Sequence, residues 1–324
     1  MKKIAITGAN GFIGSRLSSF LLSQGYDVRC LVRKNSDLSL LAKDLETVFV
    51  DYNDSESLQT ALKDSEIVIH LAALTRAKTW EEFRKINIDL VETLVNIVNV
   101  SSSIEQFIFM SSQAAAGPAA SALPKREDEE CNPVTMYGNS KLEAEELIQD
   151  QCLKAWTILR PVSVFGPGEK DLLEYYKIVN KGIAPLIGMR HKYISLIYVD
   201  DLCRLTSLAV GNEAAYNEIF FAAGSENISM AGFAYLISQA LNKVVTKIRI
   251  FVPVLWLAAV ILELFGWSSK RPPVLNREKL REMSQRYWLA SNHKAEEILG
   301  FTQEATLVKQ MQTTINWYKE HNVL

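Results

Sequence analysis

The sequence predicts an α/β protein with a doubly wound parallel sheet and a smaller C-terminal substrate lobe. Three observations support this fold class. An apolar strand, a glycine-rich turn and an amphipathic helix follow one another at the N-terminus. Apolar segments of strand length then alternate with helical patterns, as expected for a parallel sheet covered by helices. Beyond Gly168 the alternation weakens. We therefore expect residues 1–168 to form the dinucleotide-binding domain and residues 169–324 to form mainly the substrate lobe, with room for some segments to return to the sheet.

The first strand–helix–strand unit covers residues 3–33. It opens with a short apolar run that suits a strand buried on both faces. Three glycines follow, which are Gly8, Gly11 and Gly14. A helix with one apolar side then extends to Gly25, and residues 26–32 have the pattern of a second strand. In such a unit, backbone N–H groups at the helix N-terminus hold a pyrophosphate, so the sequence predicts a nucleotide site.

The remaining elements are expected in alternation along the chain. The strands are expected at residues 48–50, 67–71, 107–110, 156–159 and near 195–199. The helices are expected at residues 55–63, 79–100, 135–151 and 172–181, with a short helix inside the loop at 35–43. Residues 113–134, rich in alanine, proline and charge, are expected to form a loop over the carboxyl edge of the sheet.

Composition excludes several classes of function. The formal net charge of -2 gives no reason to expect a nucleic-acid partner. The four cysteines are scattered without a C-x-x-C motif or a histidine cluster, so we expect free thiols and no metal site. The N-terminal apolar run is too short for a signal peptide, so a cytoplasmic location is expected.

The apolar segment at residues 251–267 stands apart from this pattern. It is shorter than the roughly 20 residues that span a bilayer, and it contains Pro253 and Glu263. We expect a buried or interfacial helix there, with peripheral membrane contact as one role.

Tyr137 and Lys141 stand four residues apart at the start of an expected helix, so their side chains share one face. A tyrosine with a pKa near 10 is a poor acid or base at neutral pH. An ammonium about 4 Å away, at an effective dielectric of about 20, favours the phenolate by roughly 4 kcal/mol. Ser112 ends a strand at the carboxyl edge of the sheet, where open α/β sheets bind their ligands. A solvated Tyr–Lys pair is the alternative without function.

The order of these motifs resembles the extended short-chain dehydrogenases/reductases, which have a Rossmann fold. The matching segments are TGANGFIG, the strand end Ser111-Ser112, Y-x-x-x-K at Tyr137 and Lys141, and R-P-x-x-V-F-G-P from Arg160 to Pro167. YVDDL near Asp201 also fits. The resemblance implies that Tyr137 is the catalytic acid/base, that Lys141 lowers its pKa and holds the nicotinamide ribose, and that Ser112 orients the substrate oxygen.

The resemblance also implies a set of cofactor-binding residues. They are Gly8, Asn10, Gly11, Phe12, Ile13, Gly14, Arg33, Lys34, Asp51, Tyr52, Leu71, Ala72, Ala73, Tyr137, Lys141, Pro161 and Val164. Where enzymes that prefer NAD place an acid at the end of the second strand, this chain has Arg33 and Lys34. Two cations suit a 2′-phosphate, so NADP is expected, with NAD as the alternative. CLVRK also resembles the branch related to dihydroflavonol reductase and 3β-hydroxysteroid dehydrogenase.

These observations predict an NAD(P)-dependent oxidoreductase or epimerase that moves a hydride between the nicotinamide and a carbinol or ketone carbon. The branch resemblance and the apolar segment favour a hydrophobic or polycyclic small-molecule substrate. A nucleotide-sugar epimerase or dehydratase and a non-catalytic NADP-sensing regulator are the alternatives. A homodimer through the expected helices at 79–100 and 135–151 would match the family. His70 is expected to be a near-core residue, and Arg160 and Arg190 to meet an anionic substrate group or to be structural.

Overall fold

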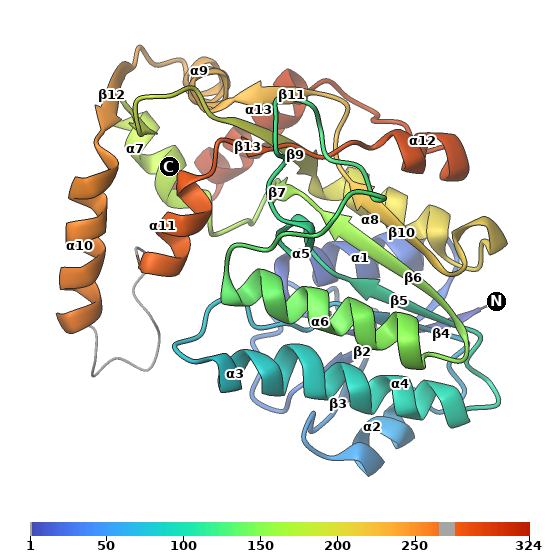
Figure 1. The fold of residues 1–324 in the computed structure, drawn as a ribbon. Coiled ribbons are helices and arrows are strands. Elements are labelled where there is room, and N and C mark those ends of the chain that lie inside the picture. The colour runs from blue at the N-terminus through green and yellow to red at the C-terminus, as the bar shows by residue number, and fades with distance from the viewer. Residues whose placement is uncertain (1, 266–275) are drawn as a thin grey trace.

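A computed structural model describes residues 2–265 and 276–324 (Figure 1). Its main feature is a seven-stranded sheet, with the strands in the order β10-β6-β5-β4-β1-β2-β3. Every pair of neighbours in it is parallel. The strands are β1 (Lys3–Thr7), β2 (Asp27–Val32), β3 (Glu46–Phe49), β4 (Ile67–His70), β5 (Gln106–Met110), β6 (Ala155–Pro161) and β10 (Glu218–Ala222). The predicted doubly wound parallel sheet is confirmed.

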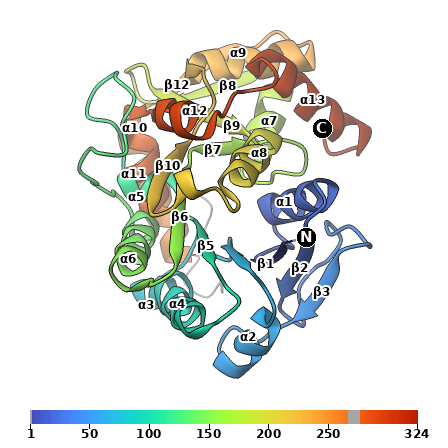
Figure 2. The same cartoon turned by 90° about the vertical axis from the view of Figure 1, so that its right-hand side faces the viewer.

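Both faces of this sheet are covered by helices, as Figure 2 shows. Ile4 and Ile6 of β1 pack into the core under α1 (Phe12–Ser23) and α8 (Val199–Ala209). Ala5, between them, packs into the opposite core with α2 (Ser55–Leu62), α4 (Leu90–Val100) and α6 (Met136–Gln151). Because successive strand residues point to opposite faces, the continuous apolar run of β1 contributes side chains to the cores on both faces of the sheet.

The order of the strands places the site. β1 pairs with β2 on one side and with β4 on the other, so the chain winds outward in both directions from β1. A sheet of this kind binds its ligand where the winding reverses, at the carboxyl ends of the strands. The residues after β1, β4 and β5 therefore meet at one edge.

The helix expected at residues 79–100 contains an irregular turn. It consists of α3 (Trp80–Arg84), a π-helical turn η1 (Lys85–Asp89) and α4. Thr79 and Glu82 form a capping box at its start, which satisfies two backbone N–H groups. The π-helical turn contains the buried Asn87.

Two local predictions were wrong. Residues 35–43 contain turns and no helix, because the Asp37 carboxylate accepts from Ser39 N, a local bond that competes with helix formation. The loop expected at residues 113–134 begins with a short helix, α5 (Gln113–Ala116), whose N-terminus is capped by Ser112.

The later part of the chain builds a second lobe above the sheet. β7 (Ser163–Phe165), β9 (Tyr193–Tyr198), β11 (Asn227–Ser229) and β13 (Tyr287–Trp288) form one small sheet, and β8 (Ile183–Ile187) pairs with β12 (Thr246–Ile250) in another. The helices of this part are α7 (Leu173–Asn180), α9 (Met230–Leu241), α10 (Val252–Phe265), α11 (Arg277–Ser284), α12 (His293–Leu299) and α13 (Leu307–Glu320), with a 3-10 turn η2 (Glu213–Ala215). β10 and α8 belong to the main sheet and its cover although they follow Gly168.

Candidate active site

The glycine turn after β1 packs tightly against itself. A Cβ atom on Gly14 would lie 2.2 Å from the carbonyl oxygen of Gly8, so no larger residue fits there. Gly11 is the N-cap of α1 and has no side chain to cover the first-turn N–H groups of Phe12 and Ile13. An anion can approach these groups closely, as a dinucleotide pyrophosphate requires. The residues present therefore fit a dinucleotide.

The side chain of Tyr52 holds this turn through hydrogen bonds. Its hydroxyl group accepts from Gly8 N at 3.3 Å and donates to the Leu31 carbonyl at 2.9 Å. Burial raises the pKa of Tyr52 to about 12, so the hydroxyl stays protonated and keeps both bonds. Sequence reasoning predicted a cofactor contact for Tyr52 and missed its bond to the glycine turn.

The end of β2 presents its two cations to solvent. Arg33 and Lys34 are exposed, and Arg33 is close enough to lower the pKa of Tyr52 slightly against the effect of burial. Asn10 donates to the Asp37 carbonyl at 3.2 Å, which joins this loop to the glycine turn. Asp51 is exposed after β3 and accepts from Asn53, whose hydrogen bonds lower the pKa of Asp51. The predicted adenosine-binding residues thus border one region beside the turn.

The segment after β4 lies beside the same turn. Leu71, Ala72 and Ala73 are half-buried, and Ala72 N donates to the Thr7 hydroxyl at 3.3 Å. That hydroxyl also bonds to Nδ1 of His70 at 2.6 Å. His70 is fully buried and stacks on Phe109, and burial lowers its pKa to about 3. His70 is therefore a neutral core residue, as expected.

The structure brings Tyr137 to Ser112, the residue after the end of β5. The two side chains are close enough for Ser112 to lower the pKa of Tyr137 against the effect of burial, and the Ser112 hydroxyl accepts from Ala114 N at 3.1 Å. Gly138 makes this approach feasible, because a Cβ atom there would lie 2.4 Å from the Ala114 carbonyl oxygen. The glycine of YGNSK thus lets the N-terminus of α6 pack directly on α5.

Lys141 lies one turn further along α6 and is buried. Its Nζ donates to the Met110 carbonyl at 2.8 Å and lies 4.3 Å from the centre of the Phe109 ring. Burial lowers the pKa of Lys141 to about 7, while the Glu145 carboxylate acts in the opposite direction. The lysine therefore lies under the end of β5, beside the strand that carries Ser112.

One electrostatic expectation is not met. The sequence predicted that Lys141 lowers the pKa of Tyr137, but burial raises that pKa to about 12. The nearby carboxylates of Glu282 and Asp171 raise it further, and Ser112 lowers it. The reason is that removing a phenolate from water outweighs the influence of a lysine whose own charge is disfavoured by burial.

A buried ion pair fixes the same inward side of α6, one turn beyond Lys141. Glu145 accepts from Arg160 at 2.6 Å, and both side chains are almost completely buried. The hydroxyl of Ser111 also bonds to Glu145. Arg160 is therefore structural, one of its two expected roles, and Ser111 and Ser112 have different partners. Sequence reasoning missed Glu145, although its i+4 spacing from Lys141 placed it on the same inward face.

Two further groups border the tyrosine. Asn87 donates to the Leu74 carbonyl at 2.9 Å and accepts from Leu74 N at 2.8 Å, which fixes the segment after β4. In α11, Glu278 accepts from Met136 N at 2.7 Å, directly before Tyr137. No sequence motif indicates α11, so the contact of Glu278 with the start of α6 was not predicted.

The remaining predicted contacts lie beyond β5. Pro161 is buried at the end of β6, and Val164 is half-buried in β7, which pairs with β9 of the second lobe. Pro161 ends β6, the strand next to β5 in the sheet, and Val164 follows it. They therefore lie at the carboxyl edge, on the side of the second lobe.

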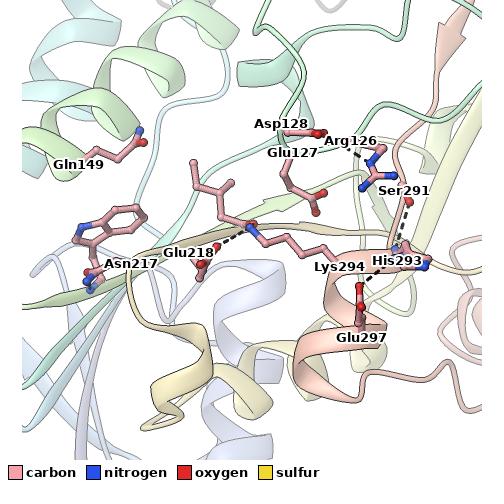
Figure 3. A pocket seen from close by; sticks show the side chains of 12 residues that line it. Arg126, Glu127, Asp128, Gln149, Asn217, Glu218, Ser291, His293, Lys294 and Glu297 are labelled. Atoms are coloured by element: carbon pink, nitrogen blue, oxygen red, sulfur yellow. Dashed lines mark hydrogen bonds and ion pairs between the residues drawn. The ribbon is translucent and has the colours of Figure 1, made fainter.

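Two hollows in the surface lie away from Tyr137. Figure 3 shows the first, of about 400 Å³, where Lys294 of α12 extends to Glu218 of β10 at 2.6 Å. Arg126 and Asp128 pair at 3.6 Å on its other side. Its charges are thus largely paired with one another. The second, of about 680 Å³, is bordered by the loop after α5 and by Arg190 and Arg286.

Comparison with known proteins decides the family. The model of the NAD dependent epimerase/dehydratase family matches residues 4–222. The chain belongs to this family. Its match covers the glycine turn, the Ser112–Tyr137–Lys141 group and the whole seven-stranded sheet.

Known proteins that are similar in sequence to this chain include enzymes of several kinds. UDP-glucose 4-epimerase of Vibrio cholerae is 28% identical over 83% of this chain and 84% of its own length. Ceramide reductase of Caulobacter vibrioides is 24% identical over 98% and 94%, respectively. Sterol-4-alpha-carboxylate 3-dehydrogenase, decarboxylating, of Dictyostelium discoideum is 27% identical over 93% and 96%. The chain is an NAD(P)-dependent oxidoreductase or epimerase of the extended short-chain dehydrogenase/reductase type.

Solved structures of the family share the fold. The UDP-glucose 4-epimerase of Thermotoga maritima, solved with UDP-glucose, has a TM-score of 0.81 with 21% identity over 99% of both chains. The UDP-glucuronic acid 4-epimerase of Bacillus cereus in complex with NAD has a TM-score of 0.77 with 20% identity over 98% of this chain and 99% of that one. The expected Rossmann-type architecture is confirmed by these matches.

Proposed function

We propose that this chain is an NADP(H)-preferring oxidoreductase that acts on a carbonyl or carbinol carbon of a hydrophobic or polycyclic substrate. The observation that carries the proposal is the position of Tyr137 beside Ser112. It lies after the end of β5, with Lys141 beneath it and the glycine turn after β1 at the same edge of the sheet. A bound nicotinamide dinucleotide supplies the hydride chemistry.

The chain's own residues handle the proton and the orientation. At neutral pH the phenol of Tyr137 is protonated, since its pKa is about 12, so it is ready to donate a proton to a substrate oxygen. The Ser112 hydroxyl beside this phenol orients that oxygen. Lys141, with a pKa near 7, is positioned by the Met110 carbonyl and is proposed to hold the nicotinamide ribose.

The preference for NADP rests on the charge at the end of β2. Arg33 and Lys34 are exposed beside the glycine turn and suit a 2′-phosphate. NAD is the alternative cofactor. The hydrophobic substrate is supported by the two relatives named for ceramide and sterol substrates, which match nearly the whole chain.

A nucleotide-sugar epimerase is the second candidate, supported by the Vibrio cholerae relative. The two functions differ in their net reaction. A reductase consumes NADPH in proportion to product, whereas an epimerase returns the hydride and leaves the amount of cofactor unchanged.

The test is an assay of NADPH oxidation and NADP reduction with sterol-like ketones, long-chain ketones and nucleotide sugars. With the substrate so found, Tyr137→Phe should reduce kcat by a factor of about 10² or more, since it removes the transferable proton. Binding of the dinucleotide, measured by titration, should stay the same. Unchanged turnover in Tyr137→Phe would remove Tyr137 from the mechanism.

A further inference from the structure

The outward side of α10 is apolar. Exposed side chains there include Phe251, which precedes the helix, Val254 and Leu257, with exposed fractions of 60%, 59% and 64%. Ile261 and Leu262 continue the face, and Ala259 turns inward and is buried. A helix on the surface of a globular protein normally presents polar residues to water. This helix presents hydrocarbon instead.

The apolar surface continues beyond the helix. β12 leads directly into α10 along one edge of the molecule (Figure 1), and its Ile248 is exposed. Val244, just before β12, is almost completely exposed. Ile183 lies on β8, the partner strand of β12, and is exposed as well. An apolar surface that spans several elements marks an interaction site.

The charges within residues 243–262 have one sign. From residue 243 to residue 262 the chain has three cations, Lys243, Lys247 and Arg249, and no acid. All three residues are exposed. The next acid, Glu263, accepts from Arg277 Nε of α11 at 2.7 Å. Its negative charge is therefore paired with a cation of the neighbouring helix.

We propose that this surface, formed by α10 and β12, binds an anionic lipid bilayer, with α10 lying in the plane of the interface. Exposed apolar residues next to exposed cations are the pattern of an interfacial helix. At 14 residues α10 measures about 21 Å, against a hydrocarbon core of about 30 Å. Among the described residues, no helix is long and apolar enough to cross a membrane.

The charges favour a bilayer over a second copy of the chain. A two-fold contact through this surface would bring each group of cations toward the same group on the other copy. Such a contact contains no acid from residues 243–262 to compensate. Anionic headgroups supply the missing charge, and their attraction falls as salt is added.

The surface is linked to the active site, which gives the proposed function a route for its substrate. The Glu263–Arg277 pair joins α10 to α11, and Glu278 of α11 accepts from Met136 N beside Tyr137. Helix α11 therefore contacts both the proposed membrane surface and the residue before Tyr137, and we assign a lipid or sterol-like substrate from the bilayer to this route. This step rests on the proposed function, whereas the binding of the bilayer does not.

The test is flotation of the full chain with phosphatidylcholine vesicles that contain no or one-quarter phosphatidylglycerol. The chain should float with the anionic vesicles, and added salt should weaken binding. The double variant Leu257→Asp/Ile261→Asp should lower the bound fraction at least tenfold. The matched control is Leu153→Asp, at a leucine that is 81% exposed after α6, and it should bind like the natural chain.

Absence of flotation, or equal flotation of the double variant, would overturn the proposal. So would a dimer that disappears in the double variant, as measured by light scattering, because the surface would then bind a second copy. Dinucleotide titration shows that each variant is folded. If the natural chain binds the vesicles but turns over no lipid or sterol-like ketone, the proposed function is contradicted and the membrane-binding surface still stands.

Discussion

At the scale of single residues, burial decides the protonation states around the site. Tyr137 and Tyr52 have raised pKa values, whereas Lys141 and His70 have lowered ones, and in all four cases desolvation is the largest cause. Each shift favours the neutral form, since a charge loses its hydration inside the protein. Neutral side chains here still form hydrogen bonds, and so they fix geometry without the cost of a buried charge.

Arg33 tests the cofactor preference. Arg33→Ala should raise the Kd for NADPH by roughly tenfold or more, because a charge-assisted contact to a 2′-phosphate is lost. The Kd for NADH should change little. Both values can be measured by fluorescence titration of the purified protein.

The control for this experiment is Lys309→Ala, at an exposed cation on α13. It should leave both affinities unchanged. Equal losses of NADPH and NADH binding in Arg33→Ala would show that Arg33 contacts a part common to both cofactors, and the assignment to the phosphate would be wrong.

His70 predicts a dependence of stability on pH. Its pKa is about 3 in the folded protein and about 6.5 when unfolded, so below pH 6.5 only the unfolded chain takes up the proton. Stability is therefore lost as pH falls from 6.5 toward 3, by about 2 kcal/mol at pH 5. Urea unfolding at pH 7.5 and pH 5 measures this loss.

The variant His70→Gln removes the titrating group while keeping a polar side chain beside Thr7. It should lose less stability than the natural chain between the two pH values. The same loss in both proteins would assign the acid sensitivity to other groups.

At the scale of elements, α6 connects the chemistry to the core. Tyr137 at its start faces Ser112, Lys141 lies under β5, and Glu145 pairs with Arg160 of β6. These three residues follow one another at steps of four, so they share one side of the helix. The position of the tyrosine therefore depends on the buried pair two turns away.

Glu145→Gln tests this dependence. It leaves the guanidinium of Arg160 buried without its counter-charge, which should cost about 3–5 kcal/mol of unfolding free energy. The matched control is Glu146→Gln, one residue further on the exposed side of the same helix, which should change stability by less than about 0.5 kcal/mol. Similar small losses in both variants would mean that the ion pair adds little to stability.

At the scale of the whole molecule, the proposed homodimer is open to a direct measurement. The outward residues of α4 and α6 are mainly polar and include Glu92, Asn96, Glu143 and Glu146. A dimer through these helices would depend on polar contacts, which salt screens. We expect sedimentation to show a dimer at micromolar protein that weakens as salt is added. A monomer under all conditions would rule out this interface.

Much of the sheet was predictable because its signals are local. Strands β1, β4 and β5 are short apolar runs, and Thr135 caps the N-terminus of α6, which begins at Met136. The candidate site was readable for the same reason, since Tyr137 and Lys141 are neighbours on one helix. The helix wrongly predicted at residues 35–43 shows where local signals fail. There the Asp37 carboxylate accepts from Ser39 N, and this local bond competes with helical hydrogen bonds.

The sequence alone determined the fold class, the glycine turn and the residue types of the proposed chemistry, because each depends on spacing within one segment. Only the tertiary structure decided that Tyr52 holds the glycine turn, that Glu145 neutralises Arg160, and that the apolar side of α10 faces outward. These properties depend on residues far apart in the chain, and on which side of an apolar helix the rest of the protein covers. Burial is set by such long-range packing, so the pKa values of Tyr137 and Lys141 followed from the fold and not from their spacing.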